Sequence, residues 1–338
     1  MVRVWFNHWF STAYHLINLL KQGDEGKFHV IGTSKNHLAI YLRACDEVYA
    51  EQSGPENRAY VDWCLDFCRE HQVDVFVPRR GLNIIAEYRA EFAAQGVKVL
   101  CGDAPEIMEL LDEKAKTYEY FQANGIDCVP SYRVAHSYAE FQQACAELLA
   151  EGAERVCYKL TRDEGALTFR VIDDSLEDRT AFFKLPGQKV TRRAAESILS
   201  QYDYHIPVMV MPFLSGQEVS ADCLMTAQGE IVIPRFKTNQ RYSVVRLRQD
   251  IIRLCKEIMQ LLQVKVPMNI QFKLHGDKPY LLEINPRMSG GLQLSCLAAG
   301  VNIPNIAVNQ LLGIDKPWQL TERFEQRVAN IETPIILD

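Results

Sequence analysis

The first hundred residues alternate between short β-branched or aromatic runs and stretches with helical spacing, and this alternation restricts the fold more than any other feature. Runs typical of strands occupy residues 2–6, 28–32, 46–50, 73–78 and 97–101. Stretches with helical periodicity lie between them, at residues 11–23, 57–71 and 82–96. Because parallel strands need long crossover connections, the pattern predicts a small doubly wound parallel sheet.

The segment after the first expected strand argues against dinucleotide binding. Residues 6–12, FNHWFST, contain no glycine, whereas the dinucleotide fingerprint needs G-x-G-x-x-G at this point. A dehydrogenase is therefore the least favoured reading. Arg79 and Arg80 follow the fourth expected strand, where an open α/β sheet binds ligands. Two readings stay open for this pair: it binds an acidic substrate, or it flanks a helix start and faces water.

The pattern changes near residues 101–111, where we place the first domain boundary. A long helix is expected over residues 106–125, strands dominate from residue 155, and a second long helix is expected over residues 244–263. The expected domains are residues 1–104, 105–205 and 206–338. The fold class is thus α/β followed by an α+β region of two lobes.

Composition restricts the class of protein and its partners. A chain of 338 residues with 48% hydrophobic and 24% charged residues reads as a soluble globular protein of two or three domains. A net charge of −6 argues against general electrostatic binding to nucleic acid or to anionic membranes. No apolar run could span a bilayer, no signal peptide is evident, and the cysteines form no CxxC. We expect a cytoplasmic protein with reduced thiols.

Residues 269–291, NIQFKLHGDKPYLLEINPRMSGG, are expected to form two antiparallel strands around a loop at residues 276–278. That register pairs Gln271 with Glu283, and Asn269 with Asn285. Since side chains alternate along a strand, Glu283 and Asn285 should share one face. The apolar residues should face a core on the other side, namely Tyr280, Leu282 and Ile284 from the second strand.

The polar face of this hairpin carries oxygen ligands of the kind that Mg²⁺ prefers. Arg287, just beyond the strand, has the geometry to bind an anion with two hydrogen bonds. Ser289-Gly290-Gly291 then leads into an expected helix N-terminus, which favours anions. Taken alone, the same residues also fit a solvated hairpin face followed by an ordinary turn.

The hairpin closely resembles the metal-binding segment of the ATP-grasp superfamily, in the form found in carbamoyl-phosphate synthetase and related carboxylate–amine ligases. The spacing E-x-N-x-R, with a Gln twelve residues before the Glu, carries the resemblance, which extends over about residues 105–315. It implies a Rossmann-like domain that precedes two lobes, which bind ATP between them. It also implies that Mg²⁺, or Mn²⁺ in its place, binds Gln271, Glu283 and Asn285.

Other segments match the family's nucleotide site. The resemblance assigns the phosphates to Lys114 and Lys159, the adenine to a linker with Met211, Phe213 and Leu214, and the ribose to Glu218. Arg235, Lys237 and Arg241 lie where relatives hold the γ-phosphate or the substrate carboxylate, and the choice among the three is open. Arg287 would hold the carboxylate or the acyl phosphate formed from it.

Two segments depart from the family pattern. The loop after Lys159, which should cover the triphosphate, has only Gly165 and places Asp163 and Glu164 beside it. Two carboxylates there would repel phosphate unless they face solvent or an amine. We still expect residues 162–168 to act as a lid. In the adenine linker, Met211 stands where many relatives carry a Glu.

The resemblance implies an ATP-dependent ligase that converts a carboxylate to an acyl phosphate and joins it to an amine, with release of ADP and phosphate. Its partners would be small-molecule carboxylates and amines, with a homodimer as one option. Two alternatives stay open: an enzyme of carboxylase or carbamoyl type that acts on bicarbonate, and a non-catalytic ATP-binding protein.

Overall fold

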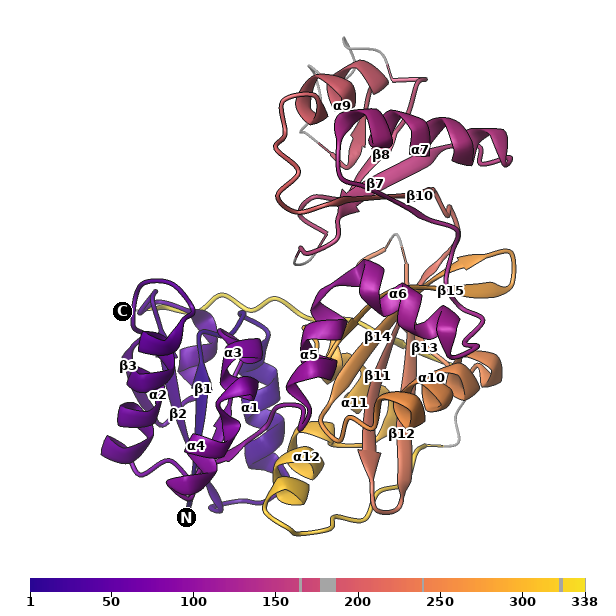
Figure 1. The fold of residues 1–338 in the computed structure, drawn as a ribbon. Helices are drawn as coiled ribbons and strands as arrows, with labels where there is room; N and C mark the ends of the chain where they lie inside the picture. The colour runs from indigo at the N-terminus through magenta and orange to yellow at the C-terminus, as the bar shows by residue number, and fades with distance from the viewer. Residues whose placement is uncertain (164–165, 177–186, 239, 322–324, 338) are drawn as a thin grey trace. The chain divides into compact units, whose positions relative to one another are not determined.

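The computed structural model of the chain describes residues 1–163, 166–176, 187–238, 240–321 and 325–337. The chain forms two compact units (Figure 1). The first unit comprises Met1–Glu109, Gln217–Phe272 and Leu282–Asp338, and the second comprises Leu110–Gly216 and Lys273–Leu281. The division into residues 1–104, 105–205 and 206–338 stays a prediction.

The N-terminal part of the first unit is a five-stranded sheet whose adjacent strands all pair in parallel, as predicted. Its order is β3-β2-β1-β4-β5, with β1 (Val2–Asn7), β2 (Phe28–Ser34), β3 (Glu47–Ala50), β4 (Val75–Val77) and β5 (Lys98–Val99). Helices connect the strands: α1 (Ala13–Gln22), η1 (Ile40–Ala44), α2 (Arg58–Glu70), α3 (Leu82–Glu87) and α4 (Arg89–Ala94). Because β1 and β4 are neighbours, the loops that follow them emerge at the same edge of the sheet.

Aromatic packing fixes β1 and β4 side by side. The Trp5 ring stacks on the Phe76 ring with 4.0 Å between centroids, and both side chains are fully buried. Val61 and Cys64 of α2 and Phe92 of α4 close the same core. Burial of such large side chains supplies much of the stabilisation of a domain.

The second sheet of the first unit has six strands in the order β15-β14-β11-β12-β13-β16. These are β11 (Glu218–Thr226), β12 (Gly229–Lys237), β13 (Ser243–Val245), β14 (Met268–His275), β15 (Lys278–Asn285) and β16 (Gln326–Val328). The helices of this region are α10 (Gln249–Leu262), α11 (Leu292–Ala299) and α12 (Ile303–Leu311). The β11–β12 hairpin forms the long central ladder of the sheet.

The second unit is built on a five-stranded mixed sheet in the order β6-β10-β7-β8-β9. Its strands are β6 (Arg133–Ala135), β7 (Val156–Leu160), β8 (Arg170–Ile172), β9 (Lys189–Val190) and β10 (Val208–Pro212). Helices α6 (Lys114–Ala123), α7 (Tyr138–Ala150) and α9 (Arg192–Leu199) belong to it. Phe141 and Leu148 of α7 pack on Val208 and Val210 of β10 in its core.

Two predicted long helices are wrong in extent. Residues 106–125 form two helices, α5 (Pro105–Asp112) and α6, because extended Glu113 ends the first and caps the second by accepting from Ala115 N–H at 3.1 Å. Residues 244–263 are not one helix, since Val244 and Val245 pair with β12 as part of β13 and α10 starts at Gln249. Strand pairing there prevails over helical periodicity.

The predicted hairpin exists, but two of its details are wrong. The turn has two residues, Gly276 and Asp277, because Lys278 already belongs to β15. Gly276 has φ of +57°, which suits a tight two-residue turn. Leu281 is fully buried while Leu282 is only half-buried, so the burial pattern departs from strict alternation at this point.

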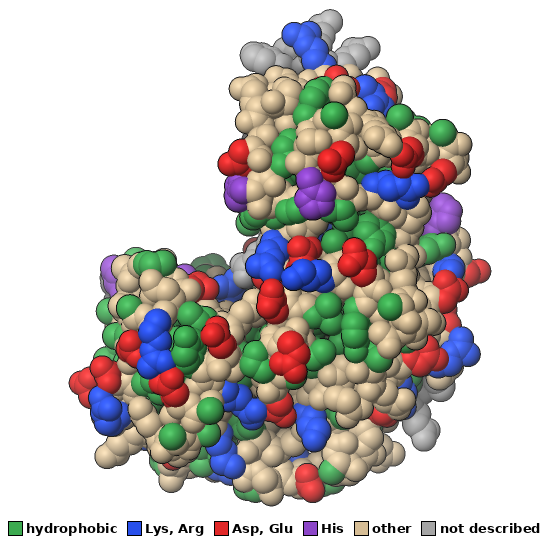
Figure 2. Space-filling model, viewed as in Figure 1, with side chains coloured by type: hydrophobic (Ala, Val, Ile, Leu, Met, Phe, Trp, Pro, Cys, Tyr) green, Lys and Arg blue, Asp and Glu red, His purple; other side chains and the backbone are tan. Residues whose placement is uncertain are grey.

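On the face shown in Figure 2, Lys and Arg side chains are interspersed with Asp and Glu side chains. Arg58 and Glu91 form an exposed ion pair, with 2.8 Å between Nη2 and Oε2. All ten cysteines are free, as expected. In the described residues, no helix is both long and apolar enough to cross a membrane.

Candidate functional site

One face of the six-stranded sheet is lined by polar side chains, most of them buried. Glu218, Ser220 and Asp222 alternate along β11 and therefore point to the same side. Arg235 of β12 lies directly opposite Ser220 in the ladder. Of the three β11 residues, the sequence predicted a role only for Glu218.

Asp222 is the centre of a buried hydrogen-bond network on this face. Its carboxylate accepts from the hydroxyls of Ser289 at 2.7 Å and Ser295 at 2.6 Å, and from the Asn269 amide at 2.8 Å. The Arg235 guanidinium lies 3.8 Å from the same carboxylate. The network joins β11 and β14 to the segment that follows β15, and so fixes the start of α11.

Glycine at position 291 is required by this network. A Cβ atom at Gly291 would lie 2.3 Å from Nη2 of Arg235, far inside van der Waals contact. The guanidinium thus fills the space beside the backbone of Gly291, and it reaches the hydroxyls of Ser220 and Ser295, each at 3.3 Å. Arg235, predicted to contact phosphate or substrate, is also a buried structural residue.

The three predicted metal ligands lie on β14 and β15. Asn285 donates to Oε1 of Glu283 at 3.1 Å, which confirms that these two side chains share a face. Gln271 donates to Oδ1 of Asn269 at 3.1 Å. Among the described residues, no three His, Cys, Asp or Glu side chains gather as a metal site. The predicted set contains one carboxylate and two amides.

The donor atoms of this set fit a hard cation. Asn285 and Gln271 each use the amide nitrogen in these contacts, so the amide oxygen is the atom that suits Mg²⁺. Asn269 differs, because it is 1% exposed and is held by Ser220 and Asp222. The assignment of Mg²⁺ to Gln271, Glu283 and Asn285 stays a prediction.

A cavity of about 690 Å³ in the first unit brings together the three predicted substrate cations, Arg235, Lys237 and Arg241. Lys237 forms an ion pair with Glu218, the predicted ribose ligand. Asn330 and Glu332 also line the cavity. It therefore offers cations together with one carboxylate, a combination that suits a small ligand carrying charge of both signs.

Arg287 and the glycines that follow it contact the loop after β1. The Arg287 guanidinium carbon lies 5.8 Å from the centroid of the Phe10 ring. A Cβ atom at Gly290 would lie 3.3 Å from the Thr12 hydroxyl and 3.7 Å from the Phe10 ring. The segment that resembles the ATP-grasp metal site is therefore packed against the N-terminal parallel sheet.

The two predicted phosphate lysines lie in the second unit, and both are buried. The Lys114 ammonium is 2.6 Å from Oδ1 of Asp163 and donates to the carbonyl of Asp163 at 2.9 Å. Burial raises the pKa of Asp163, but Lys114 and the Thr168 hydroxyl outweigh it and hold that pKa below its ordinary value. Lys159 lies in β7, opposite Met209 of β10.

The expected lid can be described only in part, because residues 164–165 lie outside the described residues. Asp163 does not face solvent, since its side chain is 4% exposed in the pair with Lys114. Thr168 holds the loop by donating to Oδ2 of Asp163 at 2.6 Å and by accepting from the backbone of Leu160 at 2.9 Å.

The predicted adenine linker lies where the chain leaves the second unit. Met211 is the fourth residue of β10 and is buried. Phe213 donates its N–H to the carbonyl of Arg155 at 2.8 Å, and the Arg155 guanidinium lies 4.8 Å from the Phe213 ring. Leu214 follows, half-buried, and the first unit resumes at Gln217.

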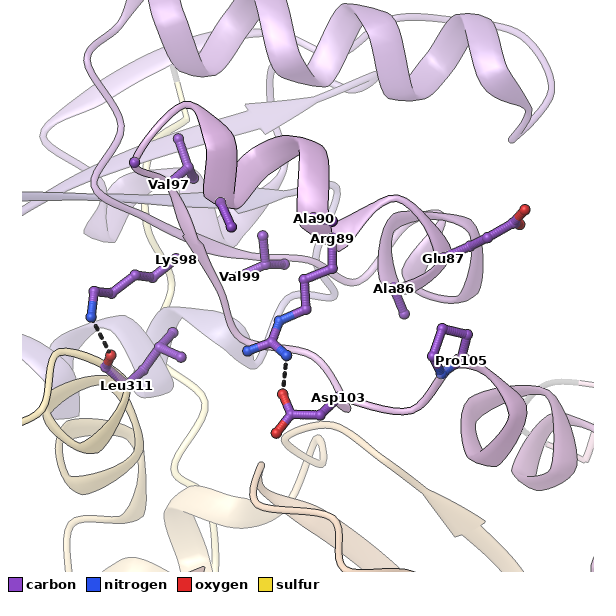
Figure 3. Close-up of a pocket in the computed structure, with 12 residues that line it drawn as sticks. Ala86, Glu87, Arg89, Ala90, Val97, Lys98, Val99, Asp103, Pro105 and Leu311 are labelled. Atoms are coloured by element: carbon purple, nitrogen blue, oxygen red, sulfur yellow. Dashed lines mark hydrogen bonds and ion pairs between the residues drawn. The ribbon is translucent and has the colours of Figure 1, made fainter.

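Another cavity, of about 730 Å³, lies beside α4 and β5 and contains no predicted site residue. Figure 3 shows that Arg89 pairs with Asp103 and that Lys98 donates to the carbonyl of Leu311. Since both cations bind partners in the wall of the cavity, it is a weaker candidate for an anion site.

Comparison with known proteins identifies the domain that carries this geometry. A family model described as an ATP-grasp in the biosynthetic pathway with Ter operon matches residues 205–334. Over these residues the chain matches an ATP-grasp domain. The carbamoyl phosphate synthase large chain of Clostridium acetobutylicum is 21% identical over 300 residues, which cover 84% of this chain. The chain spans only 26% of the length of that relative.

Solved structures show the same fold. The biotin carboxylase domain of Hydrogenobacter thermophilus 2-oxoglutarate carboxylase, crystallised with MgADP and bicarbonate, matches with a TM-score of 0.68 and 14% identity over 94% of this chain and 71% of its own. The L-amino acid ligase of Bacillus licheniformis matches with a TM-score of 0.65 and 16% identity over 92% of this chain and 74% of its own. The ATP-grasp fold class is thus confirmed.

Proposed function

We propose that this chain is an ATP-dependent ligase that activates a carboxylate and joins it to an amine. The observation that carries the proposal is the shared face of Glu283 and Asn285, followed by Arg287 and the glycine turn packed on Arg235. This arrangement supports a site in which oxygen donors for a metal lie near cations for an anionic substrate. The ligases and carboxylases among the structures of the same fold support this class of reaction.

Phosphoryl transfer of this kind depends on positioning and charge neutralisation more than on a covalent catalyst. The P–O bond to the γ-phosphorus of ATP breaks, the substrate carboxylate oxygen bonds to that phosphorus, and ADP leaves. The amine nitrogen then attacks the acyl carbon, and phosphate departs as the amine loses a proton. Magnesium, when bound, would neutralise phosphate charge.

The chain's own residues have separate roles in this proposal. Glu283, Asn285 and Gln271 hold the metal, Lys114 and Lys159 bind phosphates, and Glu218 binds ribose. Arg287 and the cavity cations Arg235, Lys237 and Arg241 orient the carboxylate. Met211, Phe213 and Leu214 contact the adenine. A homodimer remains part of the proposal.

The test uses hydroxylamine, a nucleophile that traps acyl phosphates as hydroxamates. Purified protein is given Mg²⁺-ATP, hydroxylamine and a panel of carboxylates, and both ADP and hydroxamate are measured. We expect stoichiometric formation of both with at least one carboxylate. Glu283→Gln should abolish turnover, whereas Glu230→Gln, at the other end of the same sheet, should not.

A second readout does not require turnover. Mg²⁺-ATP at about 100 times its dissociation constant should stabilise the folded protein by about 2.7 kcal/mol, which is visible as a rise in melting temperature. We expect that rise in the wild type and in Glu230→Gln, and its loss in Glu283→Gln. Absence of a rise in all three proteins would refute ATP binding at this face.

Two observations favour alternatives that the same experiment separates. The Lys114–Asp163 ion pair favours a non-catalytic ATP-binding protein, which would show the melting shift without ADP release. The bicarbonate-bound neighbour favours a bicarbonate substrate. In that case bicarbonate would stimulate ADP release without hydroxamate from any organic acid.

A further inference from the structure

The loops at the carboxyl edge of the parallel sheet carry a second group of cations close to Arg287. In a sheet of order β3-β2-β1-β4-β5, strands are added on one side of β1 up to β3 and then on its other side from β4. In open α/β sheets, ligands bind in the crevice at such a switch point. The residues there are His8 and Phe10 after β1, and Arg79 and Arg80 after β4. Both loops belong to the first unit.

Of the two adjacent arginines, Arg80 is a structural residue. Its side chain is 3% exposed, and it donates to the Glu51 carboxylate at 3.1 Å and to the Gly54 carbonyl at 2.7 Å. Its guanidinium also covers the Tyr60 ring at 4.1 Å. The partners of Arg80 are thus supplied from within the fold.

Arg79 differs from Arg80 because it is partly exposed, and the ring beside it is that of Phe10. Its guanidinium carbon is 5.8 Å from the centroid of the Phe10 ring, the same distance at which Arg287 lies from that ring. The two guanidinium groups therefore lie beside the same aromatic ring. Each of them can bind a carboxylate or phosphate with two hydrogen bonds.

Asn7 holds the loop of Arg79 in place. Its buried side chain accepts from the Arg79 N–H at 2.7 Å and donates to the Arg80 carbonyl at 2.9 Å. It also donates to the Tyr60 hydroxyl at 2.7 Å. The backbone at Arg79 is thus held by the fold, so less entropy is lost in ordering this loop when a ligand binds.

The surroundings of Phe10 are electropositive. Burial, together with the charges of Lys35, Arg79 and Arg80, lowers the pKa of His8 below its ordinary value. A group of cations that disfavours a further positive charge correspondingly favours a bound anion.

We propose that the carboxylate substrate carries a second anionic group, which Arg79 binds while Arg287 binds the carboxylate that is activated. This inference rests on the proposed function and narrows its substrate class to dicarboxylates or phosphorylated carboxylic acids. Two anionic groups of one small molecule would lie on the two guanidiniums that share Phe10.

The test measures binding without nucleotide, so that its failure is distinct from a failure of the ATP reaction. Calorimetric titrations compare dicarboxylates from malonate to adipate, and 3-phosphonopropionate, with monocarboxylates of matched length. We expect at least one dianion to bind about tenfold or more tighter than its matched monocarboxylate, as a charged hydrogen-bonded contact implies. A preference for dicarboxylates over 3-phosphonopropionate, or the reverse, identifies the second group.

Variants assign that preference to Arg79. Arg79→Met should bind the dianion and its matched monocarboxylate with equal affinity. Arg79→Lys should retain part of the preference for the dianion. Arg89→Met, which removes the arginine of the cavity in Figure 3, should leave the difference unchanged. Melting temperatures of all three variants report whether they are folded. The proposal is overturned if no dianion is preferred by the wild type, or if the preference survives in folded Arg79→Met.

Discussion

Two buried acid–arginine pairs in the first unit are held in different ways. At the edge of the parallel sheet, Glu51 contacts Arg80 directly at 3.1 Å. On the six-stranded sheet, Asp222 lies 3.8 Å from Arg235 and is held mainly by two hydroxyls and an amide. Both carboxylates join separate segments, since Glu51 also accepts from the hydroxyls of Thr33 and Tyr60. They differ in the contact with the arginine, which is direct for Glu51, whereas Asp222 is held mainly by neutral donors.

The partners that remain after a mutation also differ. Without Glu51, Arg80 would keep the carbonyls of Gln52 and Gly54 as acceptors. Without a carboxylate at position 222, the acceptors that the described residues leave to Arg235 are the hydroxyls of Ser220 and Ser295, both at 3.3 Å. Loss of one partner costs most where the other charge stays buried and poorly satisfied.

The largest effect is therefore expected for Asp222→Asn. It should lower the free energy of unfolding of the first unit by about 3–5 kcal/mol, because it leaves the Arg235 charge buried without its counter-charge. Urea unfolding followed by tryptophan fluorescence measures this, since the four tryptophans all lie in the first unit. Asp66→Asn, at an exposed site, should change stability by less than about 0.5 kcal/mol. A loss below about 1 kcal/mol in Asp222→Asn would contradict the joining role of Asp222.

A smaller loss is expected for Glu51→Gln, about 1–3 kcal/mol by the same measurement, because carbonyl acceptors still satisfy Arg80. The loss should depend on pH. Burial raises the pKa of Glu51 above its usual 4.5, in spite of Thr33, Tyr60 and Arg80. The folded wild type then binds more protons than the unfolded chain, so its stability falls as pH rises from about 4.5 through the raised pKa.

Glu51→Gln lacks this titration. The difference in free energy of unfolding between wild type and variant should therefore decrease as pH rises over that window. Unfolding curves of both proteins from acidic to neutral pH provide the check. If this difference stays constant or increases with pH, Glu51 ionises at least as readily in the folded protein as in the unfolded chain. A loss equal to that of Asp222→Asn would remove the distinction between the two pairs.

The sequence predicted what depends on local periodicity and on a compact motif. The parallel sheet followed from alternating strand and helix patterns, and the shared face of Glu283 and Asn285 followed from the period of a strand. Asp222 was missed, although Ser220 and Asp222 continue the polar alternation that starts at Glu218. That signal becomes meaningful only when the donors on β14 and α11 are known, and these come from residues distant in sequence.

Adjacent arginines show the other limit of sequence reasoning. Arg79 and Arg80 have the same chemistry and nearly the same position, so both readings of the pair were open. Tertiary contacts separate them, because Glu51 and Tyr60 surround only Arg80 while Phe10 lies beside Arg79. Similarly, the helix break at Glu113 depends on one capping interaction that periodicity does not show.

The smallest expected effect is a change in the pKa of His8 when one exposed cation beside a buried pair is removed. Each buried pair has a more exposed cation nearby, Arg79 next to Arg80 and Lys237 two residues from Arg235. Arg79→Met should raise the pKa of His8 toward its ordinary value, because burial is unchanged while one of the charges that lower this pKa is removed. Lys237→Met should leave the pKa of His8 unchanged. NMR titration of the histidine rings measures both, with His8 assigned through His8→Gln. A His8 pKa that does not move in Arg79→Met would show that the Arg79 charge does not reach the β1 loop, and would separate this edge of the sheet from the anion site proposed at Phe10.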